Sequence, residues 1–197
     1  MTMSPPDRDR FIQREDYWIS ITRRDYQTRG LGKWMLHTED PHGLYGILKE
    51  TFISGGLRDA SSIKTRARPR QGVGSVYVFS GPYTDRAKLL RLVKELRDLD
   101  EGTPLHLREP LIFKTDLHNT WCETLARPGD GYYELLKRNW LYRYKDGKLV
   151  VRAAILALHR ALEDPPPNAD PEFMIIRSML PENMFAGIEH FKNLTPD

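Results

Sequence analysis

A stretch of the chain that is typical of a β-strand carries four basic side chains at every second position: Lys64, Arg66, Arg68 and Arg70. Alternate side chains of an extended chain lie on one face, so these four form a row of cations roughly 20 Å long. Gly72 and Gly74 follow the row and let the backbone approach a ligand closely. Ammonium and guanidinium groups in this arrangement suit phosphate oxygens, so the sequence predicts an anion-binding surface.

The same row has a second interpretation, in which it protects the edge of a sheet. Edge strands often carry Lys, Arg and Pro, such as Pro69, because these residues prevent edge-to-edge aggregation. Between Arg58 and Arg91, however, there are eight basic and two acidic residues, whereas a purely protective edge could mix the two signs. The sequence alone leaves both interpretations open.

Further polar side chains lie on other predicted strands. Lys33 and His37 share one strand face, Lys114 and Asp116 share another, and His118 follows directly. If these strands are neighbours, they line one concave surface, where a lysine packed among cations has a lowered pKa and can act as a base. The candidate catalytic residues are therefore Lys64, His37 and His118, and the candidate phosphate-binding residues are Lys33, Arg66, Arg68, Arg70 and Lys114.

Aromatic side chains provide an alternative binding surface. The aromatic residues that could stack on a nucleobase beside the basic row, as in proteins that bind single-stranded RNA, are Trp18, Trp34, Trp121 and Trp140, with Tyr77 and Tyr83. Of these, Trp34, Tyr77 and Trp121 form the candidate stacking set. Buried tryptophans are more often simple core residues. The expected partners are therefore a phosphorylated peptide or protein or, as the alternative, RNA or a nucleotide.

The composition narrows the class of protein. The 197 residues are 40% hydrophobic and 29% charged, which suits one globular domain over residues 14–197 after a flexible segment over residues 1–13. A net charge of +3 is too small for a general nucleic-acid coat, so an anion site must come from local clustering. No apolar stretch approaches the ~20 residues of a membrane span and no apolar signal core is present, so we expect a cytoplasmic protein without membrane contact.

The sequence lacks the motifs of several common catalytic and metal-binding sites. Cys122 is the single cysteine, which excludes an intramolecular disulfide and a cysteine-based zinc site. The six histidines show no HExxH pattern, and the chain has neither a P-loop nor a Gly-x-Ser-x-Gly elbow. We therefore expect no metal and no cofactor.

The elements that position these residues are predicted from periodicity and turn signals. We expect strands over residues 17–21, 32–37, 62–70, 76–79, 105–108 and 111–116, and a hairpin over residues 142–151 around Asp146-Gly147. We expect helices from Pro41 to Gly55-Gly56 and over residues 84–99, 131–140, 152–163 and 182–194. Strands and helices alternate without βαβ repetition, which indicates an α+β fold with a mainly antiparallel sheet.

Short motifs between Gly32 and Trp121 resemble the basophilic leukaemia-expressed protein family. They are Gly32-Lys-Trp34, Gly56-Leu-Arg-Asp-Ala-Ser-Ser-Ile-Lys-Thr65, Val76-Tyr-Val-Phe79, Tyr83-Thr-Asp85 and Phe113-Lys-Thr-Asp116. The resemblance implies a curved antiparallel sheet backed by helices, like that of the cap-binding translation initiation factor 4E. The paired tryptophans that stack on the cap in that factor have no matching positions in this chain.

The same stretch is similar to the phosphothreonine lyases of bacterial effector proteins, which remove phosphate by β-elimination. This resemblance implies that Lys64 is the base, that Arg70 binds phosphate and that Lys33 lies on the preceding strand of the site. The effector pattern has a histidine where this chain has Met35. His37 lies on the same predicted strand face, and either His37 or His118 is the substitute that we expect for the general acid.

Overall fold

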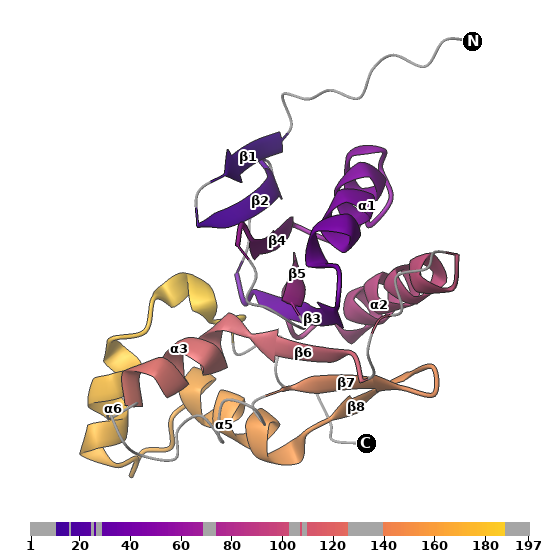
Figure 1. The fold of residues 1–197 in the computed structure, drawn as a ribbon. Coiled ribbons are helices and arrows are strands. Elements are labelled where there is room, and N and C mark those ends of the chain that lie inside the picture. The colour runs from indigo at the N-terminus through magenta and orange to yellow at the C-terminus, as the bar shows by residue number, and fades with distance from the viewer. Residues whose placement is uncertain are drawn as a thin grey trace.

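The computed structural model describes residues 11–15, 17–24, 26, 29–68, 74–102, 107, 110–125 and 140–187 (Figure 1). The strands are β1 (Phe11–Glu15), β2 (Trp18–Arg23), β3 (Gly32–Thr38), β4 (Ser62–Arg66), β5 (Gly74–Ser80), β6 (Ile112–Thr115), β7 (Tyr142–Lys145) and β8 (Lys148–Val151). The helices are α1 (Pro41–Ile53), α2 (Arg86–Glu101), α3 (Asp116–Leu125), α5 (Ala153–Glu163) and α6 (Pro171–Ser178), with a 3₁₀ turn, η2, at Glu182–Met184.

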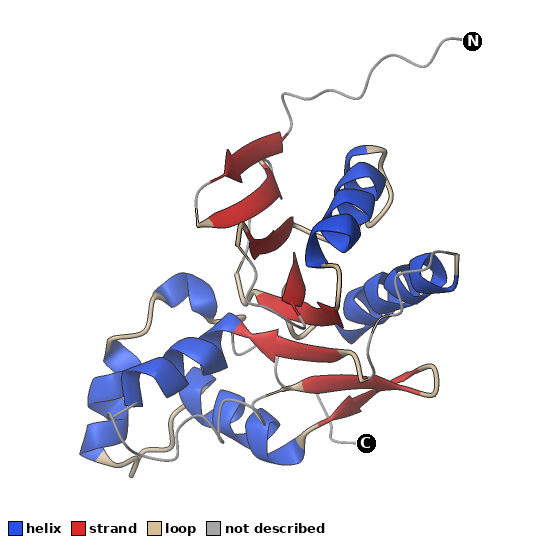
Figure 2. Ribbon diagram, viewed as in Figure 1, coloured by secondary structure: helices blue, strands red, loops and turns tan. Residues whose placement is uncertain are grey.

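The described strands form one antiparallel sheet of eight strands in the order β1-β2-β4-β5-β3-β6-β7-β8. Figure 2 shows the strands turning steadily along this order, with α1 and α2 together on one side and α3, α5 and α6 grouped near β6. The prediction of an α+β fold with an antiparallel sheet is confirmed.

The alternation of side chains in the central strands separates two faces of the sheet. On one face, Trp34 and Leu36 of β3 and Val76 and Val78 of β5 are fully buried in the core, and α1 contacts these strands. The residues that alternate with them along the strands, such as Lys33, lie on the opposite face and are partly exposed. The sheet is therefore apolar towards α1 and polar on the other side.

Local capping signals set the beginnings of the two helices that follow predicted breaks. The carboxylate of Asp40 accepts a hydrogen bond from the Gly43 amide at 2.9 Å and Pro41 occupies the first turn of α1. Asp85 likewise accepts from the Lys88 amide at 2.9 Å and caps α2. The predicted start of α1 is confirmed, and α2 begins two residues later than predicted.

The hairpin predicted around Asp146-Gly147 is also confirmed. β7 and β8 pair directly, with Lys145 opposite Lys148 across the turn. Asp146 has φ 48° and Gly147 has φ 77°, which is the positive-φ pair that a type I′ turn requires.

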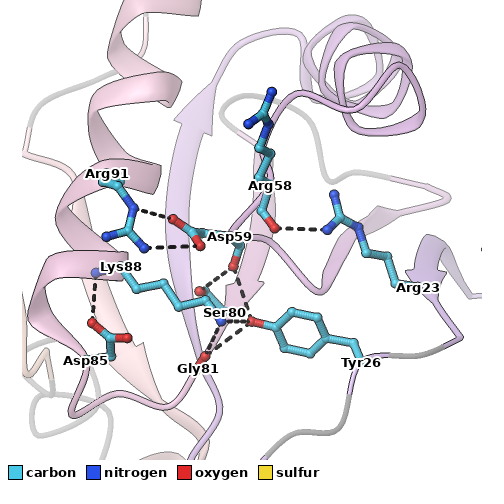
Figure 3. A network of polar contacts seen from close by, with 9 residues as sticks. All are labelled: Arg23, Tyr26, Arg58, Asp59, Ser80, Gly81, Asp85, Lys88 and Arg91. Carbon is cyan, nitrogen blue, oxygen red and sulfur yellow. Dashed lines mark hydrogen bonds and ion pairs between the residues drawn. The ribbon is translucent and has the colours of Figure 1, made fainter.

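A network of polar contacts ties the loop between α1 and β4 to β5 and α2 (Figure 3). The backbone carbonyl of Asp59 accepts a hydrogen bond from the Ser80 hydroxyl at 2.7 Å, and its carboxylate accepts one from Arg91 at 3.0 Å. Lys88 donates to the carbonyl of Gly81 at 2.7 Å. Because this loop leads directly into β4, the network fixes the start of the strand that carries the basic row.

Several boundaries differ from the prediction. β1 begins at Phe11, so residues 11–13, predicted to belong to a flexible segment, pair with β2. Asp116 begins α3 instead of ending a strand, and neither α3 nor α6 was predicted from the sequence. The predicted helix at 131–140 and most of the predicted strand at 105–108 lie outside the described residues.

The helix predicted from residue 182 is wrong at its start, where the chain forms only the η2 turn. Phe185 is already extended, with ψ 139°. The next amide, that of Ala186, donates to the buried carboxylate of Glu163 at 2.6 Å. This charge-assisted hydrogen bond competes with the helical partner that the amide would otherwise have.

Among the described residues, none of the helices has both the length and the apolar character to cross a bilayer.

Candidate anion-binding site on the polar face of the sheet

Strand register brings the predicted basic residues together on the polar face of the sheet. Lys64 of β4 lies opposite Tyr77 of β5, and Tyr77 lies opposite Met35 of β3. Lys33, two residues before Met35, lies on the same side of β3 and opposite Lys114 of β6. Directly paired residues project to the same face, so the cations of three strands share one surface. We call the surface formed by Lys33, Lys64, Arg66 and Lys114 the cationic face.

The strand that carries Lys64 and Arg66 lies inside the sheet. β4 pairs with β2 on one side and with β5 on the other. Protection against edge-to-edge aggregation therefore does not explain Lys64, which has partners on both sides, and that interpretation is wrong for it; Arg66 has a partner on β2.

The predicted row of four cations is only partly seen. β4 ends at Arg66, and Arg68 lies exposed in the bend that follows. Arg70 and Gly72 lie outside the described residues. The structure thus places Lys64 and Arg66 on the cationic face and leaves Arg68 beyond the end of the strand.

Lys33 is the central charge of the cationic face. Its ammonium forms an ion pair with the Asp116 carboxylate, Nζ to Oδ1 at 3.0 Å, and lies 5.5 Å from the centre of the Phe79 ring. Asp116 is the first residue of α3, so the helix begins where its carboxylate reaches Lys33. Asp116 was predicted to share a strand face with Lys114; that is wrong, because Asp116 belongs to a helix and its carboxylate pairs with Lys33.

Lys64 lies between the aromatic and the basic parts of the surface. Partial burial lowers its pKa, the charge of Lys33 lowers it further, and Asp116 partly offsets both effects. Its ammonium lies 4.3 Å from the centre of the Trp18 ring. A lysine whose amine form is favoured in this way has the property that a general base needs.

Lys114 is the most deeply buried lysine of the cationic face, with 9% of its surface exposed. Burial lowers its pKa to about 8, with the charge of Lys33 as the second cause, and Cys122 partly opposes the change. Burial in turn raises the pKa of the Cys122 thiol to about 11. At neutral pH the neighbour of Lys114 on α3 is therefore an uncharged thiol.

The two histidines predicted as general acids have different surroundings. His37 lies on the same face of β3 as Lys33, and its Nδ1 lies 2.8 Å from the Ser75 hydroxyl. His118 is 5% exposed, and its ring lies 5.9 Å from that of His159. By strand register, His37 is the histidine that the cationic face contains.

The backbone amide of His118 belongs to a buried chain of hydrogen bonds that runs through Thr115 and His159. His159 Nδ1 lies 2.8 Å from the Ile155 carbonyl, which can only accept, so Nδ1 carries the proton and Nε2 is an acceptor. The Thr115 hydroxyl donates to this Nε2 at 2.6 Å and accepts from the His118 amide at 3.2 Å. Burial lowers the pKa of His159 to about 3, in agreement with a neutral ring.

Two of the three predicted stacking residues are in the core. Trp34 is fully buried against Phe113, with ring centres 5.3 Å apart, and Trp121 is 7% exposed and packs on Phe173. Neither ring offers an open face, so we withdraw the stacking role for both. Tyr77 lies on the polar face as predicted, opposite Lys64.

Trp18, one of the six aromatic residues named from the sequence but not a member of the candidate stacking set, lies on the polar face. It lies opposite Arg66, contacts Tyr77 edge to face with ring centres 5.8 Å apart, and sits beneath Lys64. The alternation of β2 was readable from the sequence, but the pairing of β2 with β4 was not. That pairing is what brings Trp18 to the basic residues.

No group of three or more His, Cys, Asp or Glu side chains suited to a metal ion occurs within the part of the chain that the structure describes. The chain matches no protein-family model and no curated protein in sequence.

Proposed function

We propose that the cationic face binds a phosphate-bearing ligand and that Lys64 acts on it as a base in the β-elimination of phosphothreonine. The observation that carries the proposal is the strand register, which brings Lys33, Lys64 and Lys114 to one face from three strands. Burial lowers the pKa of both Lys64 and Lys114, and the charge of Lys33 lowers it further. Like charges held this close repel one another, and a bound anion removes that repulsion. Interior strands keep such an arrangement at a cost in stability, which favours a functional explanation.

The proposed reaction uses each group in a separate role. The neutral amine of Lys64 takes the α-proton of the phosphothreonine, and the bond from the β-carbon to the phosphate oxygen breaks with its electron pair on oxygen. A double bond forms between the α- and β-carbons, and no water is consumed. Lys33 and Arg66 neutralise the phosphate, and His37 gives a proton to the departing oxygen.

The family resemblance supports this assignment. Lys64 stands in the Ile-Lys-Thr motif and Lys33 in the Gly-Lys-Trp motif that carry the resemblance, and both lie on the cationic face. We accordingly propose that the sheet is of the initiation factor 4E type. Met35, which replaces the effector histidine, lies on this face between Lys33 and His37.

A nucleotide or RNA ligand is the second candidate, and the contact between Trp18 and Tyr77 favours it. These rings lie beside Lys64 and Arg66, so a base could stack on aromatic surface while its phosphate meets a cation. Binding of this kind weakens steeply with rising salt, because phosphate contacts release counterions.

Incubation of the full chain with a phosphothreonine peptide tests the elimination. Mass spectrometry should show loss of phosphoric acid and a dehydrated residue with the wild type and with Lys148→Ala, which removes an exposed lysine of β8. Lys64→Ala should give no dehydrated product. A wild-type protein that binds the peptide but leaves it intact contradicts the lyase, and salt-sensitive RNA binding by that protein favours the second candidate.

A further inference from the structure

We propose that Lys114 is a nucleophilic amine that forms an imine with a phosphorylated aldehyde or ketone bound on the cationic face. This activity is separate from the β-elimination and does not use Lys64 as a base. It rests on the phosphate-binding half of the proposed function, because the cations around Lys114 would hold the phosphate of the carbonyl compound.

The pairing of β3 with β6 gives two adjacent lysines different states. Lys33 and Lys114 lie directly opposite each other, and Asp116 pairs with Lys33 at 3.0 Å. Lys33 is thus an ion-paired ammonium. Lys114 is packed next to that ammonium with little solvent to stabilise a second charge. Lys33 is therefore the ion-paired lysine of the two, and Lys114 is the one that gives up its proton more readily.

The groups that face Lys114 favour its neutral form. Lys33 approaches from β3 and Cys122 from α3, and Asp116 at the start of α3 is engaged by Lys33. With its pKa at about 8, roughly a quarter of Lys114 is free amine at pH 7.5, against about one part in a thousand for an ordinary lysine. Lysines activated by burial and a cationic neighbour are those that form Schiff bases in enzymes.

The reaction balances without an oxidant or a reductant. The Lys114 nitrogen forms a bond to the carbonyl carbon, and a proton moves from nitrogen to the carbonyl oxygen to give a carbinolamine. The carbon–oxygen bond then breaks, water leaves and the carbon–nitrogen double bond forms. The phosphate selects the carbonyl compound, because Lys64 and Arg66 lie on the same face as the amine.

Reductive trapping on the full wild-type chain tests the inference directly. Pyridoxal 5′-phosphate serves as the phosphorylated aldehyde, pyridoxal as its match without phosphate, and cyanoborohydride reduces any imine to a stable secondary amine. Peptide mapping then gives the rate at which each lysine is labelled. At pH 7.5 we expect Lys114 to be labelled about tenfold or more faster than the exposed Lys148, and faster with the phosphorylated aldehyde than with pyridoxal.

Two results would overturn the inference, and the first of them is distinguishable from failure of the proposed function. Labelling of Lys114 no faster than Lys148 removes the nucleophilic amine, even if phosphothreonine peptides are still eliminated. Equal labelling of Lys114 by the two aldehydes overturns the ligand class and also contradicts a phosphate site on this face.

The variant Lys33→Met provides a second test that retains Lys114. Burial continues to lower the pKa of Lys114 in this variant, but removal of the neighbouring charge raises that pKa, so labelling at pH 7.5 should be slower than in the wild type. The matched variant Lys148→Met should leave the rate unchanged. A Lys33→Met protein that labels at the wild-type rate would show that the arrangement of the two lysines is not what activates Lys114.

Discussion

Lys33 and Lys114 lie directly opposite each other where β3 pairs with β6, and both project to the polar face of the sheet. Like charges in directly opposed positions destabilise a sheet. The Asp116 carboxylate neutralises the charge of Lys33. Burial and the charge of Lys33 lower the pKa of Lys114, which favours its uncharged form. This pair is the electrostatic centre of the proposed site.

Replacement of Lys114 by Met should stabilise the protein at neutral pH. The pKa of Lys114 is about 8 in the folded chain and 10.5 in the unfolded one, so the unfolded chain binds more protons between these values. The free energy of unfolding of the wild type should therefore rise from pH 8 to pH 10.5. Below pH 8 the full destabilisation by the charged Lys114 is present. Urea unfolding at several pH values should show Lys114→Met more stable by about 3 kcal/mol at pH 7, with the difference vanishing near pH 10.5.

Lys148→Met is the matched control for that experiment, because Lys148 is exposed on β8. It should show no pH-dependent gain. A Lys114→Met protein less stable than the wild type at pH 7 would mean that the ammonium of Lys114 is stabilised in the fold.

His159 should make the protein sensitive to acid. Burial lowers its pKa from 6.5 to about 3, so the unfolded chain binds more protons in that window and stability falls as the pH drops through it. For this one group the loss between pH 7 and pH 5 is about 2 kcal/mol. His159→Gln keeps a donor and an acceptor but cannot titrate, so its unfolding free energy should fall less between those pH values. An unchanged slope would contradict a neutral buried imidazole.

Tyr83→Phe should weaken the attachment of the chain segment that follows η2. The fully buried Tyr83 hydroxyl donates to the Glu163 carboxylate at 2.6 Å, and the same carboxylate accepts from the Ala186 amide. A hydrogen bond to a charged acceptor contributes about 1.5–3 kcal/mol, and urea unfolding should show a loss of that size. Tyr144→Phe, on the partly exposed β7, is the control and should change stability by less than about 0.5 kcal/mol. Equal losses in both variants would mean that the Tyr83 hydroxyl has no special role.

Arg66 and Arg68 should contribute unequally to phosphate binding. Arg66 projects from β4 with its guanidinium 5.6 Å from the centre of the Trp18 ring, whereas Arg68 lies in the bend beyond the strand. Loss of one charge-assisted contact to phosphate corresponds to about a tenfold weaker affinity, so calorimetry with a phosphothreonine peptide should show this for Arg66→Ser. Arg68→Ser should change the affinity less than about twofold. The reverse order would place the phosphate beyond the end of β4.

Sequence patterns predicted the elements that depend on neighbouring residues. The start of α1 at Pro41 and the Asp146-Gly147 turn each depend on a few neighbouring residues, so their outcome is readable locally. The contact of Lys33 with Lys114 depends instead on which distant strands pair, and no local pattern encodes that choice. For the same reason the sequence analysis left Trp18 out of the predicted site.

The early end of β4 and the missed start of α3 have a common physical origin. Tertiary contacts override local propensity at both places: Arg66 is the last β4 residue with a partner on β2, and Asp116 is drawn to Lys33 as α3 begins. The alternation of Lys64 and Arg66 was therefore a reliable guide to their face. The predicted strand, however, continued to Arg70, whereas β4 ends at Arg66.

The most direct test of the cationic face is an NMR titration of the ¹⁵N-labelled protein with a phosphothreonine peptide and with its unphosphorylated form. The account predicts saturable shifts of the amides of Lys33, Lys64 and Lys114 with the phosphopeptide, no such shifts with the unphosphorylated peptide, and loss of saturation in Lys33→Met. Shifts confined to other surfaces, or equal responses to both peptides, would contradict a phosphate site on this face of the sheet.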